Sequence, residues 1–264
     1  MSLTPRFYCP APLSSGASLL LPPGAARHVQ VLRLQPGAPI VLFGGSPPPA
    51  DGTQGTAPEQ AACGEFEATV VEMGRSDVRV LVGRHCAVER EPVRRLHLAI
   101  GMPANERMDW LVEKATELGV ASVQALMTER TVVRLDGERA RKKADHWLSI
   151  AIASCEQCGR NQVPVLPLAL PLRQWLAQMG RPGAPDGGLR LVLSFRAGAR
   201  PLAEWLREPR GGEAAAVTIL SGPEGGLGPA EEQQALDLGF QPVTLGPRVL
   251  RSETAAIAAL TLLG

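Results

Sequence analysis

A glycine-rich segment holds the first residues that could do chemistry. Ser221–Gly228 reads SGPEGGLG, follows an apolar run over Val217–Ser221 and precedes a helix signal that begins at Pro229. Glycines let a backbone approach a ligand closely, and free amides at a helix start favour an anionic or polar group. The glycine spacing matches neither a P-loop nor the Rossmann fingerprint. Taken alone, the segment fits a ligand loop or a plain strand-to-helix turn.

A second segment repeats this arrangement closer to the C-terminus. Leu245–Ala255 reads LGPRVLRSETA. It again leads from a strand, through a Gly-Pro turn, to a helix whose start we expect Ser252 or a neighbour to cap. Because ligands collect at the carboxyl ends of strands in an open parallel sheet, loops from adjacent strands would face one crevice. The two loops together predict a ligand site.

This pair of loops resembles the cofactor-binding signature of the SPOUT methyltransferases, specifically the RsmE family of 16S ribosomal RNA uracil-N3 methyltransferases. Other family-like segments occur in family order: PRFY from Pro5, HVQVLRL from His28, ERMDWLVEKATELG from Glu106, ER at Glu129, Arg134, and CEQCGRN from Cys155. The chain departs from the family pattern at Ala104-Asn105, where Lys-Gly is usual, and at Cys158, where Ser is usual. The resemblance thus covers nearly the whole chain.

The resemblance implies S-adenosylmethionine as the cofactor, bound by a C-terminal trefoil knot, and a homodimer as the working form. The cofactor-binding residues that it implies are Leu220, Gly222, Pro223, Gly225, Gly226, Leu245, Gly246, Leu250, Ser252 and Thr254. It implies 16S ribosomal RNA, within the small ribosomal subunit, as the substrate. The methylated atom would be N3 of one uridine in helix 44 of the decoding region, uridine 1498 in the usual numbering.

Methylation of uracil N3 requires loss of the N3 proton, so the site must accept this proton or stabilise the anion. From their positions in the two loops, we expect Arg251 to steady the uracil oxygens. We expect Glu253 or Glu224 to orient the base and to be the candidate proton acceptor. Two alternatives stay open: Glu253 as a first-turn carboxylate that suits the helix dipole, and Glu224 as an acceptor that braces its loop.

Any contact with RNA must come from local patches, because Lys+Arg 27 against Asp+Glu 26 leaves a net charge of +1. Arginine side chains often bind the phosphate groups of nucleic acids. The candidate RNA-binding residues are Arg6, Arg33, Arg130, Arg134 and Arg160. The alternative for each is an ordinary solvated surface arginine, and the basic run Arg139–Lys143 also suits a solvated helix face.

The cysteines and histidines predict no metal site. Cys155 and Cys158 form a C-x-x-C, but no second pair lies at zinc spacing. The four histidines show neither H-x-x-x-H nor H-E-x-x-H spacing. Five scattered cysteines also argue against a disulfide framework and favour a reducing compartment.

The elements that must position these residues change in character near residue 88. Before it, short β-like runs and one helix signal predict a small β-barrel over residues 1–88, which the resemblance identifies as PUA-like. The expected elements there are strands Leu19–Leu21, Pro39–Phe43, Glu65–Glu72 and Asp77–Val82, and a helix over Gly24–Leu34. Ser46–Ala62 is interpreted as a hairpin extension without chemistry.

From residue 89 to 264 strands alternate with helices, which predicts an α/β domain with a mostly parallel sheet. The expected strands are Leu96–Gly101, Val120–Met127, Leu189–Ser194, Val217–Ser221 and Pro242–Gly246. The expected helices are Glu106–Leu118, Glu138–Cys158, Leu172–Met179, Pro229–Leu238 and Ser252–Leu263. The last helix is apolar around almost its full circumference, so we expect its own domain or a second copy of the chain to bury it.

Composition bounds the class of protein. The chain has 264 residues, of which 45% are hydrophobic and 20% charged, as expected for a globular protein with a proper core. We find neither a membrane span nor a signal peptide and expect a cytoplasmic protein. Two alternatives to the methyltransferase stay open: a SPOUT-fold RNA-binding protein without turnover, and a methyltransferase that acts on another RNA.

Overall fold

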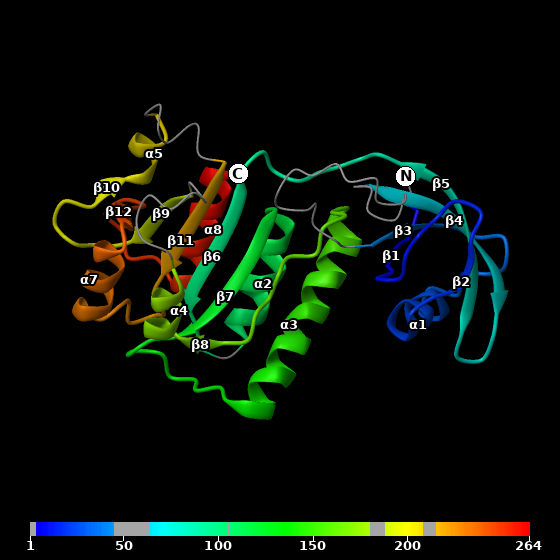
Figure 1. Cartoon of the computed structure of the whole chain (residues 1–264), viewed down its shortest axis with the longest axis horizontal. Coiled ribbons are helices and arrows are strands. Elements are labelled where there is room, and N and C mark those ends of the chain that lie inside the picture. The colour runs from blue at the N-terminus through cyan, green and yellow to red at the C-terminus, as the bar shows by residue number, and fades with distance from the viewer. Residues whose placement is uncertain (1–3, 45–63, 105, 180–187, 208–214) are drawn as a thin grey trace. The chain divides into compact units, whose positions relative to one another are not determined.

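The computed structural model describes residues 4–44, 64–104, 106–179, 188–207 and 215–264 (Figure 1). The chain forms two compact units. The first contains Met1–Glu91 and Ile152–Val163, and the second contains Pro92–Ala151 and Pro164–Gly264. The Ser46–Ala62 extension lies outside the described residues. The predicted division of the chain at residue 88 stays a prediction.

A five-stranded sheet with one helix builds the first unit. Its elements are β1 Arg6–Tyr8, β2 Ser18–Leu20, α1 Pro23–Val31, β3 Pro39–Phe43, β4 Glu65–Met73 and β5 Val78–Cys86. The strand order is β1-β3-β4-β5-β2, in which β1 pairs parallel with β3 and the other pairs are antiparallel. The predicted strands and the helix are confirmed, with ends shifted by a few residues. Arg33 takes a left-handed φ of 54°, so the helix ends before Leu34.

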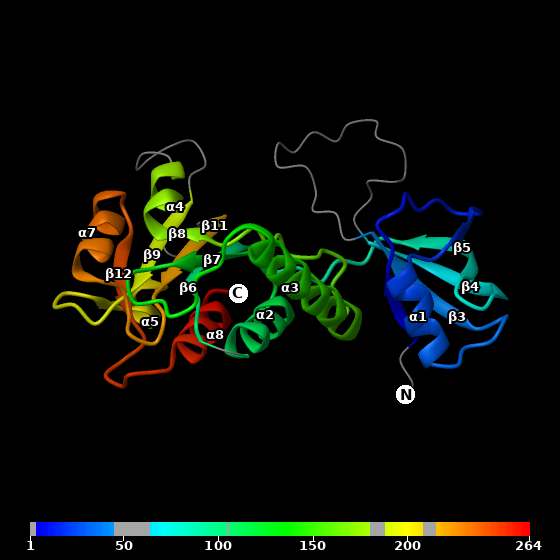
Figure 2. The ribbon, with the colours of Figure 1, turned by 90° about the horizontal axis from the view of Figure 1, so that it is seen from below.

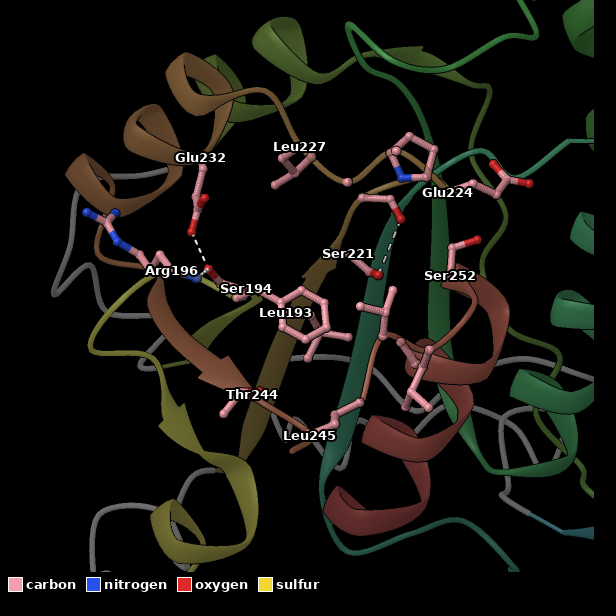
Figure 3. A pocket seen from close by; sticks show the side chains of 18 of the residues that line it. Leu193, Ser194, Arg196, Ser221, Glu224, Leu227, Glu232, Thr244, Leu245 and Ser252 are labelled. Carbon is pink, nitrogen blue, oxygen red and sulfur yellow. Dashed lines mark hydrogen bonds between the residues drawn. The ribbon is translucent and has the colours of Figure 1, made fainter. Parts of the chain in front are cut away.

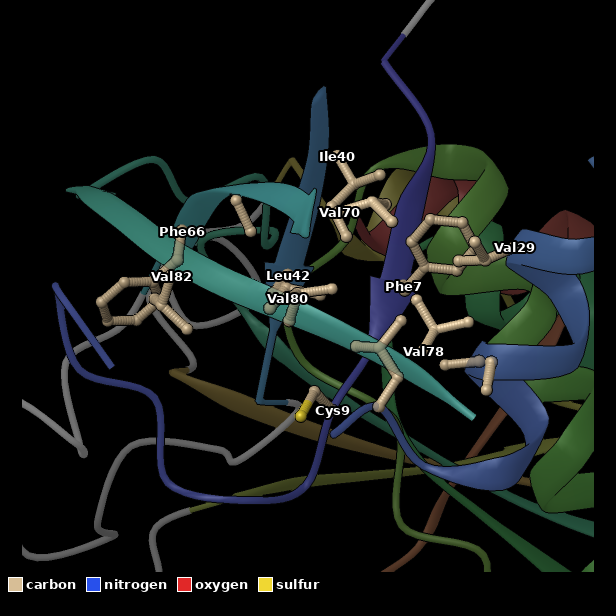
Figure 4. Close-up of a cluster of buried hydrophobic side chains, with 14 of the residues drawn as sticks. Phe7, Cys9, Val29, Ile40, Leu42, Phe66, Val70, Val78, Val80 and Val82 are labelled. Carbon is tan, nitrogen blue, oxygen red and sulfur yellow. The ribbon is translucent and has the colours of Figure 1, made fainter. Parts of the chain in front are cut away.

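The core of this unit follows from alternation along its strands. In β5 the side chains of Val78, Val80 and Val82 are buried, while the residues between them are exposed. Figure 4 shows these valines with Phe7 of β1 and Val29 of α1 in one apolar cluster. Period-two alternation therefore turns one face of the sheet toward the core.

The second unit is an α/β fold with a seven-stranded sheet. Its strands are β6 Arg95–Gly101, β7 Val120–Met127, β8 Leu170–Pro171, β9 Leu189–Leu193, β10 Arg200–Pro201, β11 Ala216–Ser221 and β12 Gln241–Thr244. Its helices are α2 Arg107–Glu117, α3 Gly137–Cys158, α4 Leu172–Gln178, α5 Leu202–Trp205, α7 Pro229–Asp237 and α8 Ser252–Leu263. α3 begins in this unit and ends in the first.

Every pair of described strands in this sheet is parallel, in the order β10-β12-β9-β11-β6-β7-β8. α2 and α8 pack together on one face, and α4 and α7 pack together on the other (Figure 2). The expected parallel sheet is confirmed, as are its five predicted strands and the five predicted helices; β8 and β10 add two strands that were not predicted. The order also brings the carboxyl ends of β9, β11 and β6 side by side.

The ends of two helices explain how the loops before them are held. Gly228 is the N-cap of α7, Pro229 is its first residue, and Glu231 accepts a hydrogen bond from the Gly228 N–H at 2.9 Å. At α8 we expected Ser252 or a neighbour at the N-cap position, and the neighbour Arg251 occupies it, without a side-chain capping hydrogen bond. Ser252 is already helical, and its Oγ instead donates to Glu253 Oε2 at 3.2 Å.

One side of α8 is buried within the chain, against α2, β6 and β11. Ala256, Leu260 and Leu263 lie on this side and are at most 2% exposed. On the other side, Ile257 and Ala258 are half-buried, and Leu262 is 48% exposed. A single copy therefore buries α8 only in part. Among the described residues, no helix combines the length and the apolar composition that a membrane span requires.

Candidate active site

A cavity of about 400 Å³ lies at the carboxyl ends of β9, β11 and β12 (Figure 3). Three segments line it: Leu193–Arg196 after β9, Ser221–Leu227 after β11, and Thr244–Leu250 after β12. Arg130, Glu232, Ser252 and Ala255 also line it. The two loops singled out in the sequence thus face one cavity, at the edge of the sheet where parallel strands collect ligands.

The loop after β11 folds tightly on itself. The Gly226 N–H donates to the Pro223 carbonyl at 2.8 Å. A Cβ on Gly222 would lie 2.5 Å from the Gly226 carbonyl carbon, so only glycine fits there. Arg130, from the loop after β7, donates to the Gly225 carbonyl at 2.5 Å. The glycines Gly222, Gly225 and Gly226 therefore contribute only backbone atoms to this wall of the cavity.

The loop after β12 makes the opposite wall. Gly246 has a φ of +113°, a left-handed backbone conformation that favours glycine. The Gly246 N–H donates to Thr244 Oγ1 at 3.3 Å, and the chain then continues through Leu250 to the start of α8. The turn at Gly246 explains why β12 ends at Thr244, two residues before the predicted end.

One end of the cavity is polar. Ser194 Oγ donates to Glu232 Oε1 at 2.5 Å and accepts the Arg196 N–H at 2.9 Å. Figure 3 shows Glu232 directed toward Ser194 from α7. Arg196 and Arg248 also line the cavity, so both charge signs are available to a ligand with an ammonium and a carboxylate group.

Arg107, at the start of α2, links the two loops through their carboxylates. Its Nη1 donates to Glu224 Oε1 at 2.9 Å, and its Nε lies 3.8 Å from Glu253 Oε1. Burial by itself raises the pKa of the Glu224 carboxyl. Hydrogen bonds from the Ala104 N–H, from its own backbone and from Arg107 outweigh burial and hold this pKa below its usual value. Glu224 is therefore ionised at neutral pH.

The structure places most of the predicted cofactor-binding residues around the cavity. Those that line it are Gly222, Pro223, Gly225, Gly226, Leu245, Gly246, Leu250 and Ser252. Leu220 lies in the strand beneath and belongs to the buried core. Thr254 lies on the exposed side of the first turn of α8.

The three predicted catalytic residues lie close together in the chain fold but differ in exposure. Glu224 lines the cavity, and Glu253 is buried beside Ser252. Arg251 is exposed at the N-cap of α8. Arg107 interacts with the carboxylates of both Glu224 and Glu253, so one cation balances the charge of both.

The predicted RNA-binding arginines fall into two groups. Arg33, Arg130 and Arg134 are exposed. Arg6 is partly buried in the first unit, where it pairs with Glu65 at 2.5 Å and donates to Asn161 Oδ1 at 2.7 Å. Arg160 is 3% exposed and pairs with Glu91. A phosphate contact by Arg6 or Arg160 would require these ion pairs to open.

Sequence reasoning gave no role to several residues of the site. Arg107 belongs to a family-like segment and is the first residue of α2. The order of residues in that segment does not show that α2 begins beside the glycine loop. The polar end of the cavity, with Ser194, Arg196 and Glu232, depends on the placement of β9 beside β11. Within the described part of the chain, no three His, Cys, Asp or Glu side chains gather as metal ligands would.

Comparison with known proteins extends the picture to the whole chain. Residues 89–264 match a family model described as an RNA methyltransferase domain. Two curated relatives are described as ribosomal RNA small subunit methyltransferase E. The one from Bacillus subtilis is 30% identical over 206 residues, which are 75% of this chain and 76% of the relative. The one from Mycobacterium bovis is 30% identical over 264 residues, 98% of this chain and 90% of the relative.

A solved structure gives the same result. The chain is similar, at 35% identity and a TM-score of 0.83, to a protein of Neisseria gonorrhoeae that is described as ribosomal RNA small subunit methyltransferase E bound to S-adenosyl methionine. The match covers 98% of this chain and 96% of that protein. The likeness therefore extends over both compact units.

Proposed function

Because the chain belongs to the ribosomal RNA small subunit methyltransferase E family, we propose that it transfers a methyl group from S-adenosylmethionine to 16S ribosomal RNA. It has the SPOUT methyltransferase fold. The observation that carries the proposal is the cavity into which the loops after β11 and β12 converge. Our finer proposal is that the methyl acceptor is N3 of the helix 44 uridine, within the small ribosomal subunit in the cytoplasm.

The cavity fits S-adenosylmethionine in size and chemistry. Its volume of about 400 Å³ lies within the range of roughly 300 to 1,000 Å³ typical of ligand pockets. Backbone groups of the two loops suit an adenosine, and Glu232, Arg196 and Arg248 offer partners for the hydroxyl, ammonium and carboxylate groups. We propose that the residues predicted from the sequence hold the cofactor, with Leu220 and Thr254 contributing from the strand end and the first turn of α8. We also propose that the segments around them form the trefoil knot.

S-adenosylmethionine supplies a methyl group that is already activated for transfer. For uracil N3 to accept the methyl, the N3–H bond must break and its proton must pass to a base. Glu224, with its lowered pKa and its hydrogen bond from Arg107, is a weak proton acceptor, and we assign it to positioning. Glu253 is buried and lies 3.8 Å from Arg107, so we assign the proton to it. Arg251 steadies the uracil oxygens.

We propose that the first unit is the PUA-like barrel and that it contacts RNA. Exposed arginines support this role, because phosphate contacts position a nucleic acid on a protein. Arg33 in the first unit and Arg130 and Arg134 in the second are exposed. We further propose a homodimer, supported by the outer side of α8, where Ile257, Ala258 and Leu262 are only partly covered.

Methyl transfer to small ribosomal subunits that lack their native N3-methyluridine tests this function. Labelled S-adenosylmethionine is the donor, and reverse-transcriptase stops map the product, because an N3 methyl blocks base pairing. We expect one new stop, in the decoding region of 16S ribosomal RNA.

The other outcomes separate the alternatives. Transfer to a different position or to another RNA would contradict the proposed substrate. Cofactor binding without transfer to any RNA would indicate an RNA-binding protein that has lost turnover. Failure to bind S-adenosylmethionine would show that the two loops do not form a cofactor site.

A further inference from the structure

A second cavity lies in the same unit, at the carboxyl ends of β6 and β7. Its volume is about 740 Å³. Met102 and Pro103 line it from the connection between β6 and α2, and Val133 and Leu135 line it from the loop between β7 and α3. Arg107 of α2 and Lys143 of α3 complete its charged rim, together with Glu106 and Asp109. Nothing in the proposed cofactor site uses this space.

Neighbouring residues of the same segments line or border the two cavities. Next to Met102 and Pro103, the Ala104 N–H donates to Glu224, which lines the cofactor cavity. In the loop after β7, Arg130 lines the cofactor cavity, and Val133, three residues later, lines the second. In the sheet, β6 stands between β11 and β7. The cavities are therefore neighbours along one edge, separated at this point by the Arg107–Glu224 ion pair.

The chemistry of the second cavity suits a nucleotide. Its floor is apolar and buried, with Met102, Met108 and Trp147 at most 3% exposed. The Trp147 indole N–H donates to Asp109 at 2.9 Å, which fixes the ring. Lys143 is exposed at the rim and ends the basic run Arg139–Lys143. A flat base fits an apolar floor, and a phosphate fits a rim cation.

We propose that the second cavity binds one nucleotide of the acceptor RNA, with its base on the apolar floor and its phosphate toward Lys143. This inference rests on the proposed function. A transfer reaction needs donor and acceptor atoms about 3 to 3.5 Å apart, so the acceptor strand must occupy space next to the cofactor. The second cavity is that space, and Lys143 stands at its rim.

Two neighbouring valines allow a matched test. Val133 lines the cavity, whereas Val132 is 82% exposed and does not line it. Val133→Phe would add an aromatic ring to the lining of the cavity, and Val132→Phe adds the same ring outside it. We expect Val133→Phe to lower kcat/KM for small ribosomal subunits by about 100-fold, because acceptor positioning is lost. Val132→Phe should match the wild type, and calorimetry should give both variants wild-type affinity for S-adenosylmethionine.

Wild-type rates in Val133→Phe, with normal cofactor affinity, would overturn the inference and leave the proposed function standing. If Val133→Phe fails to fold, a comparison of Lys143→Ala with Lys142→Ala tests the inference instead. Lys142 is the control, because it is exposed and does not line the cavity. Lys143→Ala should raise KM for subunits and leave cofactor affinity unchanged. Equal behaviour of the two lysine variants would overturn the inference. If the wild type transfers no methyl group, the proposed function fails. The variants are then compared by their binding to small ribosomal subunits, measured by sedimentation, which still tests the second cavity.

Discussion

Glu224 and Glu253 reach one guanidinium from two loops that are separated in sequence but meet at the cavity. The Arg107 guanidinium donates to Glu224 at 2.9 Å and lies 3.8 Å from Glu253. Arg107 thereby places one positive charge beside both carboxylates, and it also fixes the glycine loop to the start of α2. We infer that Arg107 sets both the charge and the geometry of the site.

Arg107→Ala should raise the pKa of the Glu224 carboxyl toward its usual value of 4.5, because the hydrogen bond and the charge of the guanidinium are lost. In the wild type, Glu224 stays ionised as the pH falls through 4.5, since its pKa lies lower. In the variant it becomes protonated at higher pH. The acid limb of the pH profile of kcat/KM should therefore move to higher pH.

Two further variants make this prediction specific to charge. Arg107→Lys keeps the positive charge and should return the acid limb toward the wild-type position. Arg173→Ala removes an exposed arginine on α4, outside both cavities, and should leave the profile unchanged. An Arg107→Ala profile identical to the wild type would contradict the assigned role.

At the scale of elements, the glycine loop is held by close backbone contacts. In Gly222→Ala, the new Cβ would lie 2.5 Å from the Gly226 carbonyl carbon and 2.6 Å from the Leu227 nitrogen. Overpacking against backbone costs about 1 to 3 kcal/mol, so affinity for S-adenosylmethionine should fall by roughly 5- to 150-fold. Titration calorimetry measures this fall. Gly24→Ala is the matched control, because no atom lies within 4 Å of its Cβ. Full cofactor affinity in Gly222→Ala would show that the loop shape does not matter for binding.

The longer elements could be predicted because their hydrophobic periods are strong. β6, β7 and α7 begin and end within two residues of the expected bounds. The two-residue strands β8 and β10 and the four-residue helix α5 were missed, since such short elements show no period. The two short strands form because the neighbouring strands β7 and β12 offer edges with which they can pair.

The candidate site could be predicted only where it is local in sequence. The two loops carry their own turn residues, and most of their predicted ligand residues line one cavity. Arg107 and Ser194 lie at the site because of the order of the strands and the placement of α2. Both are properties of the tertiary structure and cannot be read from the local sequence. The contacts of Ile152–Val163 with the first unit are also tertiary, because they join segments that lie far apart in the chain. There Glu156 accepts the Tyr8 N–H at 3.0 Å, a contact between residues 148 positions apart.

At the scale of the whole molecule, the outer side of α8 predicts how copies associate. In the proposed homodimer, a twofold interface contains each side chain twice. Leu262 is 48% exposed on this side, and burying the rest of its surface contributes about 1 kcal/mol per copy. Leu262→Glu removes this contribution twice and adds two like charges, so the dimer dissociation constant should rise on the order of 100-fold or more.

Sedimentation velocity over a range of concentrations measures this change directly. Leu20→Glu is the matched control, because Leu20 is 49% exposed but lies on β2 in the first unit. We expect the wild type and Leu20→Glu to sediment as dimers at concentrations where Leu262→Glu sediments as a monomer. Since Ser252, at the start of α8, lines the cofactor cavity, loss of the dimer should also weaken binding of S-adenosylmethionine. A wild-type chain that is monomeric at all concentrations, or a Leu262→Glu variant that remains dimeric, would place the interface elsewhere or remove it.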